Sequence, residues 1–202
     1  FTDLAGNSGV AVDNTTDGSR FTFDNTAPVL GNITLVSTNA KDNLSYAKAG
    51  DNITLAFTSN EAIQAPSVAL AGSTVTATDT SGGSKTSWKA VYPVVAGDTG
   101  NVAFSINPQD KAGNSGSQVT EAIVDNRMAI DNSVPDLSSI TLKSSNSDST
   151  LAKASETVTL EFTVSESIVD PVVRVNGVAA ELDGAGTFWQ ATYTVPEQRV
   201  KV

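Results

Sequence analysis

Three acidic residues in the first two thirds of the chain are the side chains most able to do chemistry. Asp24, Glu61 and Asp110 each lie in a polar stretch beside an apolar run, and Asn25 follows the first of them. Ca²⁺ takes six to eight oxygen ligands from carboxylates and carbonyls in flexible geometry, whereas Mg²⁺ demands a stricter site. We expect these residues to bind Ca²⁺ if the fold brings their loops together.

A second set of candidate ligands follows further along the chain. Asp131 and Asn132 stand 107 residues after Asp24 and Asn25, and Glu166 stands 105 residues after Glu61. Asp98 lies in the loop before Val102, where it would reach the same second site. The repetition predicts one calcium site at each junction between structural modules.

The same residues also have a purely structural interpretation. Asp24 and Asp131 suit Asx-turns that shape a linker, and Glu61 suits a solvated loop, as does Glu166. The pair Gly113-Asn114 suits a tight turn that requires positive φ. The sequence leaves the metal-binding and the structural interpretation open.

The composition excludes most kinds of enzyme. The chain contains no His and no Cys, so it has no Ser-His-Asp triad, no cysteine nucleophile and no zinc site of the usual kinds. A glycosidase needs two carboxyl groups facing each other across a cleft. Here the acids recur at each module, as expected for a structural device, and we predict no enzymatic activity.

Charge and hydropathy also restrict the partners. Twelve Lys and Arg residues oppose 22 Asp and Glu residues, which gives a formal charge of −10. Such a charge disfavours binding to nucleic acid and suits either solvation or cations. The longest apolar runs are too short to cross a bilayer, so we expect no direct membrane insertion.

The chain repeats itself with a period close to 107 residues. The run DNTAP at 24–28 returns as DNSVP at 131–135, and the run at 3–9 returns at 110–116. The offset shortens to 101 by Trp88 and Trp189. We therefore predict a complete module at 24–130, the last strands of a preceding module at 1–23, and a module without its last strands at 131–202, all within a longer polypeptide.

The hydrophobic pattern predicts β-strands throughout. Residues 51–58 alternate apolar and polar side chains, which is typical of a strand with one buried face. Trp88 belongs to an apolar strand face and is expected in the core. The dipeptide Asn176-Gly177 predicts a hairpin. The other expected strands are 30–36, 67–70, 74–78, 87–95, 102–106, 118–130, 173–175 and 178–180. This pattern favours an antiparallel two-sheet sandwich.

The predicted strand order places the first set of acids at one end of the module. If the order is that of an immunoglobulin domain, strand 30–36 leaves this end and strand 51–58 returns to it. The connection at 59–65 and the hairpin turn at 110–116 then lie there. The expected neighbours are Asp24, Asn25, Glu61, Asp110 and Asn114.

Three short motifs resemble the bacterial immunoglobulin-like repeats of giant secreted adhesins and other cell-surface proteins. They are DNTAP at 24–28, FTSNEAI at 57–63 and DKAGN at 110–114. The resemblance implies an all-β fold of tandem immunoglobulin-like antiparallel β-sandwich modules. It implies an extracellular rod that holds a binding tip away from the bacterial cell surface, with adjacent modules as partners and calcium at the junctions.

Three classes of function are compatible with these features. The first is a structural stalk or spacer. The second is a module that recognises carbohydrate or a host protein, although its loops are rich in Ser, Thr, Gly and Asn rather than aromatic residues. The third is a fibre subunit whose residues 1–23 complete a neighbouring subunit by strand addition. Pairing of chain ends between molecules would favour the third.

Overall fold

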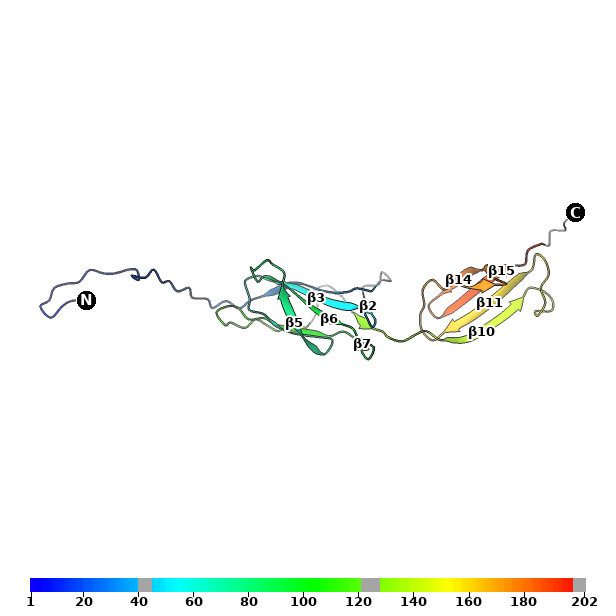
Figure 1. Ribbon diagram of the computed structural model, residues 1–202, viewed down its shortest axis with the longest axis horizontal. Coiled ribbons are helices and arrows are strands. Elements are labelled where there is room, and N and C mark those ends of the chain that lie inside the picture. Colours follow the sequence, from blue (N-terminus) through cyan, green and yellow to red (C-terminus); the bar gives the residue numbers. More distant parts are fainter. Residues whose placement is uncertain (40–44, 121–127, 198–202) are drawn as a thin grey trace. The chain divides into compact units, whose positions relative to one another are not determined.

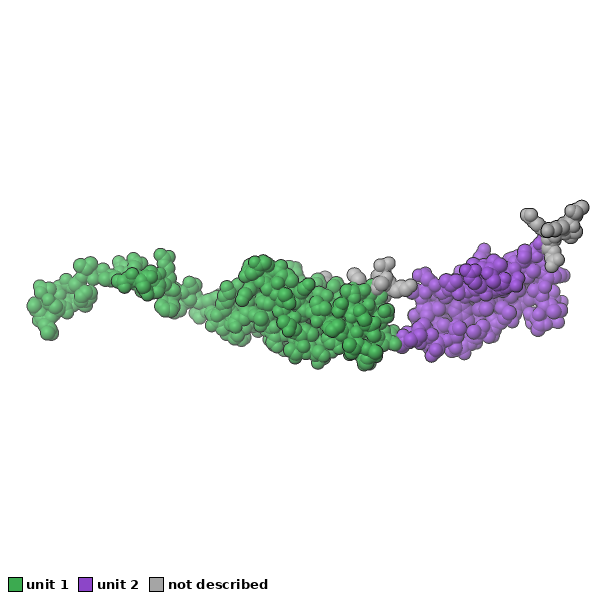
Figure 2. Space-filling view, in the orientation of Figure 1, with its two compact units in different colours: residues 1–132 green, residues 133–202 purple. Residues whose placement is uncertain are grey.

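The computed structural model describes residues 1–39, 45–120 and 128–197, which form two compact units (Figure 1). Unit 1 comprises Phe1–Asn132 and unit 2 comprises Ser133–Val202 (Figure 2). All regular structure in the described residues is β-strand, which confirms the predicted all-β class. These residues therefore include no helix that could cross a membrane.

Unit 1 contains a six-stranded sheet in which neighbouring strands are antiparallel. The strands are, in spatial order, β1 (Leu30–Ser37), β3 (Asn52–Ser59), β6 (Ser87–Pro93), β5 (Ser73–Asp79), β4 (Ser67–Leu70) and β8 (Phe104–Asn107). β5 pairs with β6 through residues 77–79 and with β4 through residues 73–76. The sequence predicted each of these strands to within a few residues.

A second, three-stranded sheet departs from the prediction. It consists of β2 (Tyr46–Ala47), β9 (Ala129–Ile130) and β7 (Gly100–Asn101), and β2 pairs with β9 in parallel. Of the long strand expected at 118–130, the described residues show β9 and a bridge between Val119 and Ile106, and 121–127 lie outside the described residues. Side-chain alternation does not encode strand direction, so the parallel pair could not be foreseen.

The core of unit 1 lies on the alternating faces of β1, β3 and β6. Ile53, Leu55 and Phe57 of β3 are at most 2% exposed. Trp88 is buried beside them, as predicted, and its indole Nε1–H donates to the carbonyl of Lys85 at 3.2 Å. Period-two alternation thus places one face of each strand in the core.

The predicted hairpin at Asn176-Gly177 is confirmed in unit 2. It joins β12 (Arg174–Val175) to β13 (Val178–Ala179), and both turn residues have positive φ. Ala71 and Gly72 form the same two-residue turn between β4 and β5 of unit 1. Positive φ at both positions gives a turn whose twist matches the flanking strands.

Unit 2 presents one open face of an antiparallel four-stranded sheet. Its strands, in spatial order, are β10 (Leu137–Ser144), β11 (Thr157–Val164), β15 (Phe188–Thr194) and β14 (Glu181–Ala185). Ile140 and Leu142 of β10 are 57% and 62% exposed, whereas Ile33 and Leu35 at the corresponding places of β1 are 2% and 3% exposed. The apolar pattern is therefore the same in the two units, but among the described residues it is buried only in unit 1.

Residues 1–23 are exposed to solvent along their whole length. Phe21 and Phe23 are 91% and 92% exposed. Asp3 and Asn7 close a local turn, in which Asp3 Oδ1 accepts the backbone N–H of Asn7 at 2.8 Å. The segment therefore forms a local turn, but none of its side chains is buried.

We expect Phe57→Ala to lower the free energy of unfolding of unit 1 by about 3–5 kcal/mol, because the substitution leaves a cavity in a packed core. Chemical denaturation followed by tryptophan fluorescence measures the change. Val91→Ala, at a half-exposed position of β6, is the control and should cost about 1 kcal/mol or less. Equal effects of the two substitutions would contradict this location of the core.

Candidate metal centre

Three carboxylates meet at the end of unit 1 that we call the N-terminal pole. One oxygen each of Asp24, Glu61 and Asp110 lie within 4.8 Å of one another. Asp24 precedes β1, Glu61 follows β3 and Asp110 follows β8. These are three of the residues that the sequence predicted to converge.

Backbone pairing holds the loops of the N-terminal pole together. Ile63 and Asp110 form an antiparallel bridge, and the N–H of Gln64 donates to the carbonyl of Gln109 at 2.8 Å. The side chain of Gln64 also donates to the carbonyl of Asp110 at 2.7 Å. Glu61 and Asp110 are therefore brought close by the path of the backbone.

The segment that carries Asp24 is fastened to the same loops. The N–H of Val29 donates to Asn60 Oδ1 at 2.8 Å. A Cβ at Gly116 would lie 2.3 Å from the carbonyl oxygen of Pro28, so only glycine allows this approach. Asp24 itself accepts the N–H of Thr26 at 3.0 Å, which is the expected Asx-turn.

Asp110 is the buried anchor of the cluster, with 1% of its surface exposed. Its Oδ1 accepts the backbone N–H groups of Gly113 and Asn114 at 2.7 and 2.8 Å. Its Oδ2 accepts the side-chain amide of Asn114 at 2.7 Å, and the same amide donates to the carbonyl of Asp24 at 2.9 Å. Asn114 thus connects Asp110 to the segment of Asp24.

The surroundings move the pKa values of Asp110 and Glu61 in opposite directions. Burial would raise the pKa of Asp110, but the hydrogen bonds from Asn114 and Gly113 outweigh it and hold the pKa below its usual value. Burial, followed by the charges of Asp24 and Asp110, raises the pKa of Glu61. Glu61 Oε1 is buried and has no hydrogen-bond partner among the described residues.

The cluster therefore offers carboxylate oxygens that a cation could bind, and its negative charges repel one another. The lowered pKa of Asp110 favours its ionised form, whereas burial and the charges of Asp24 and Asp110 oppose the ionisation of Glu61. A divalent cation beside Glu61 Oε1 would satisfy this oxygen and offset the repulsion. Three carboxylates would leave room for the carbonyl and water ligands that Ca²⁺ also takes.

Asn132 and Asp98, both predicted for the second calcium site, contact each other in unit 1. Asn132 lies at the opposite end of unit 1, the C-terminal pole, where its Oδ1 accepts the N–H of Ala49 at 2.6 Å and its Nδ2 donates to the carbonyls of Val95 and Asp98. Asp98 Oδ2 accepts the hydroxyl of Tyr92 at 2.8 Å and the N–H of Val95 at 2.9 Å. Both side chains fasten loops of unit 1 to one another.

Of the remaining predicted ligands, Asn25 was expected at this first site, and Asp131 and Glu166 at the second. Asn25 is exposed, and no acid other than the three described joins a group of this kind in the described residues. Asp131 belongs to unit 1 and Glu166 to unit 2, where Glu166 Oε2 accepts the hydroxyl of Ser133 at 3.3 Å. A second calcium site with Asp131 and Glu166 stays a prediction.

Sequence reasoning missed the polar residues that hold the site together. Gln64 has no counterpart in the second copy, so repetition gave no signal for it. Asn60 did carry a signal, because a polar residue, Ser165, stands at its place in the repeat. Ser165 accepts the N–H of Asp136 at 2.9 Å, as Asn60 accepts the N–H of Val29 at 2.8 Å.

No model of a known protein family matches the chain, and neither a curated protein nor a solved structure shows significant similarity to it.

We expect Glu61→Gln to melt at a higher temperature than the wild type in chelator at pH 7. The raised pKa of Glu61 means that its contribution to stability is present below the unfolded-state pKa and is lost as pH rises through the folded-state pKa. The two proteins should converge below pH 4, where the glutamate is protonated. Circular dichroism melts across this pH range test it.

Glu181→Gln is the matched control, because it removes the same charge from an exposed position of β14. It should leave the melting temperature nearly unchanged at every pH. A Glu61→Gln protein no more stable than the wild type at pH 7 would contradict the proposed crowding of charge.

We expect Asn114→Ala to make the chain more sensitive to acid. The lowered pKa of Asp110 gives stability above the unfolded-state pKa, and this stability is lost as pH falls through the folded-state value. Without the Asn114 amide the pKa of Asp110 rises, so the loss begins at higher pH. Lys111→Ala, in the same turn, is the control, and an unchanged acid midpoint in Asn114→Ala would refute the role of this amide.

Proposed function

We propose that this chain is part of a structural spacer made of tandem immunoglobulin-like β-sandwich modules on the surface of a bacterium, in a secreted or cell-surface adhesin. Its partners are adjacent modules of the same kind, and it has no catalytic role. The observation that carries the proposal is that the contacts of unit 1 recur in unit 2 at the spacing of the sequence repeat.

Two sets of contacts illustrate the recurrence. Asp51 Oδ2 accepts the N–H of Lys48 at 2.9 Å, and Glu156 Oε2 accepts the N–H of Lys153 at 2.8 Å. The indole of Trp189 donates to the carbonyl of Gly186 at 3.1 Å, as Trp88 does to Lys85. Repeated domains of about a hundred residues are suited to extending a chain in steps of one domain.

The burial pattern supports the sandwich architecture. Ile106 of β8 and Val68 of β4 are fully buried in the same core as β1, β3 and β6. These strands contribute to one core, and β5 passes from β6 to β4 along its length. This arrangement is typical of two packed sheets with alternating inward side chains.

We further propose that Ca²⁺ binds Asp24, Glu61 and Asp110. The support is the close approach of the three carboxylates together with the buried, unpartnered Glu61 Oε1. Asp24 lies on the segment that leads into β1, whereas the other two lie on loops of the module. A cation would therefore fasten the incoming segment to the module and stiffen the junction.

We expect millimolar Ca²⁺ to raise the melting temperature of unit 1 relative to chelator. Binding to the folded state alone adds about 2.7 kcal/mol when free Ca²⁺ exceeds Kd by a hundredfold. Calorimetry of the whole chain measures the gain, and equimolar Mg²⁺ should give less. Asp24→Asn and Glu61→Gln should each reduce it, since each removes a ligand charge.

Asp98→Asn is the control, because Asp98 lies at the C-terminal pole. There its carboxylate accepts hydrogen bonds from Tyr92 and Val95. It should lower stability without reducing the gain from Ca²⁺. Melting that is unaffected by Ca²⁺ in the wild type would remove the calcium part of the proposal.

A further inference from the structure

Asparagine residues followed by a small residue are candidates for spontaneous covalent modification. The backbone nitrogen after an asparagine can attack its side-chain amide and close a five-membered ring, and such a reaction is fast only when the two groups can meet. A following glycine hinders this approach least, because it has no Cβ. Asn176-Gly177 is the one Asn-Gly pair in the sequence, which also contains four Asn-Ser pairs.

The Asn176-Gly177 pair is exposed at the tip of the β12–β13 hairpin. Arg174 donates from its guanidinium to the carbonyl of Gly177 at 3.2 Å. Among the described residues, neither the side-chain amide of Asn176 nor the N–H of Gly177 has a hydrogen-bond partner. Both reacting groups are therefore free.

Unit 1 has the same turn at Ala71-Gly72, with strands paired on both sides of β4. There the N–H of Ala71 donates to the carbonyl of Ala103 at 2.9 Å, whereas the N–H of Gly72 has no partner in the described part of the chain. Apart from chain neighbours, a Cβ at Gly72 or Gly177 would meet no heavy atom within 4 Å. The peptide between the two turn residues can therefore rotate, as ring closure requires.

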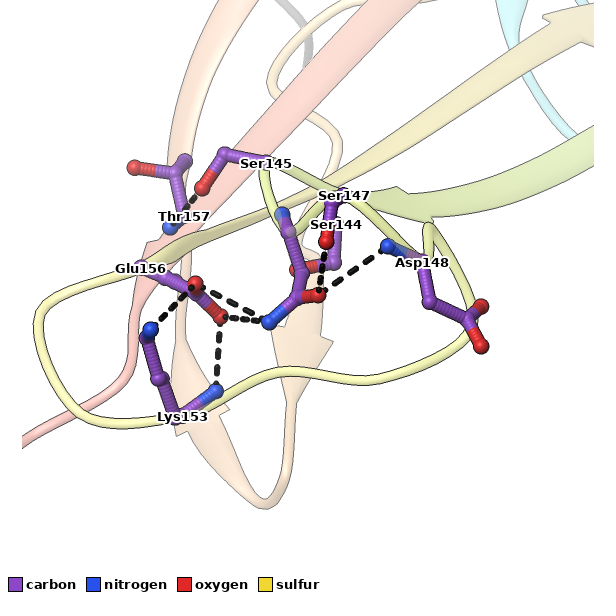
Figure 3. A network of polar contacts seen from close by, with 8 residues as sticks. Ser144, Ser145, Ser147, Asp148, Lys153, Glu156 and Thr157 are labelled. Atoms are coloured by element: carbon purple, nitrogen blue, oxygen red, sulfur yellow. Dashed lines mark hydrogen bonds and ion pairs between the residues drawn. The ribbon is translucent and has the colours of Figure 1, made fainter.

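Asn146-Ser147, in the loop after β10, is held by hydrogen bonds. Asn146 donates its amide Nδ2 to both carboxylate oxygens of Glu156, at 3.0 and 2.9 Å, and its Oδ1 accepts the N–H of Asp148 at 3.0 Å. Figure 3 shows the Glu156 carboxylate in this loop, where it also accepts the backbone N–H of Lys153 at 2.8 Å. Ring closure at Asn146 must first break the bonds to Glu156.

The other three Asn-Ser pairs are held in a similar way. Each donates its side-chain amide to an oxygen of another residue: Asn7 to Asp3 at 2.8 Å, Asn114 to Asp110 at 2.7 Å, and Asn132 to the carbonyl of Asp98 at 2.8 Å. Asn176 thus differs from all four in two respects, the glycine that follows it and its free amide.

We propose that Asn176 is a site of spontaneous deamidation. Hydroxide removes the proton of the Gly177 N–H, and this nitrogen bonds to Cγ of Asn176. The Cγ–Nδ2 bond breaks, and Nδ2 takes a proton from water and leaves as ammonia. Water then opens the resulting succinimide at either carbonyl and gives aspartate or isoaspartate at this position, with no change in oxidation state. Both products add one negative charge to the hairpin.

The two products affect the hairpin differently. The turn depends on positive φ at both Asn176 and Gly177, with values of 50° and 76°. Aspartate tolerates this conformation. Isoaspartate carries an extra carbon atom in the backbone, so it should break the pairing of β12 with β13. The modification depends on neither calcium nor the spacer role.

Peptide mapping by mass spectrometry, after incubation of the whole chain in mildly alkaline buffer, tests the site. We expect the peptide with Asn176 to show the mass change of amide-to-acid conversion, with an isoaspartate fraction that chromatography separates. Asn146 in the same folded chain is the internal control and should be modified at least about tenfold more slowly. An unmodified Asn176, or equal rates at Asn176 and Asn146, would overturn the proposal.

The protection of Asn146 is tested by freeing its amide. Glu156→Ala removes both acceptors and should raise the deamidation rate of Asn146 by about tenfold, without changing that of Asn176. Lys153→Ala is the control, because it removes the ion pair between Lys153 Nζ and Glu156 Oε1, at 3.7 Å, and keeps both acceptors.

Wild-type chain unfolded in urea frees the same amide without a substitution and should show the same gain at Asn146. Circular dichroism reports whether Glu156→Ala is folded. An Asn146 rate that is the same in native and unfolded chain would contradict protection by Glu156, and so would an unchanged rate in folded Glu156→Ala.

Discussion

The buried carboxylate of Asp110 is the contact on which the N-terminal pole of unit 1 depends. A carboxylate removed from water must be compensated by hydrogen bonds or charge. Asp110 receives three N–H groups from its own turn, and Asn114 extends this bonding to the carbonyl of Asp24. The Asp110 carboxylate therefore closes the turn at 110–116. Through Asn114 it also positions the segment of Asp24, which leads into the module.

The hydrogen bonds that stabilise the buried Asp110 carboxylate also keep its negative charge close to Glu61. Holding Asp110 ionised and close to Asp24 leaves Glu61 beside two negative charges, with one oxygen buried and unpartnered. A proton on Glu61 would relieve this repulsion, and so would a divalent cation shared by the three carboxylates. A bound cation would make the junction stiffer when calcium is abundant, in keeping with the proposed extracellular spacer.

The sequence predicted what depends on local pattern and missed what depends on the path of the chain. Alternation located the buried strand β3, the dipeptide Asn176-Gly177 located a hairpin, and the assumed strand order brought Asp24, Glu61 and Asp110 together. The parallel pairing of β2 and β9 was missed, because alternation carries no direction. Asn132 holds loops of unit 1 together through its amide, and a metal-binding role for it stays a prediction, because an amide that holds a loop and one that ligates a metal look alike in sequence.

The pKa of Glu61, measured by carbon-13 NMR of its side-chain carboxyl in chelator and in Ca²⁺, tests the central claim most directly. The account predicts a value above the ordinary 4.5 in chelator, because burial and two neighbouring charges oppose ionisation. It predicts a large fall on addition of Ca²⁺, because a bound cation favours the carboxylate. An ordinary pKa in chelator that Ca²⁺ does not change would contradict it.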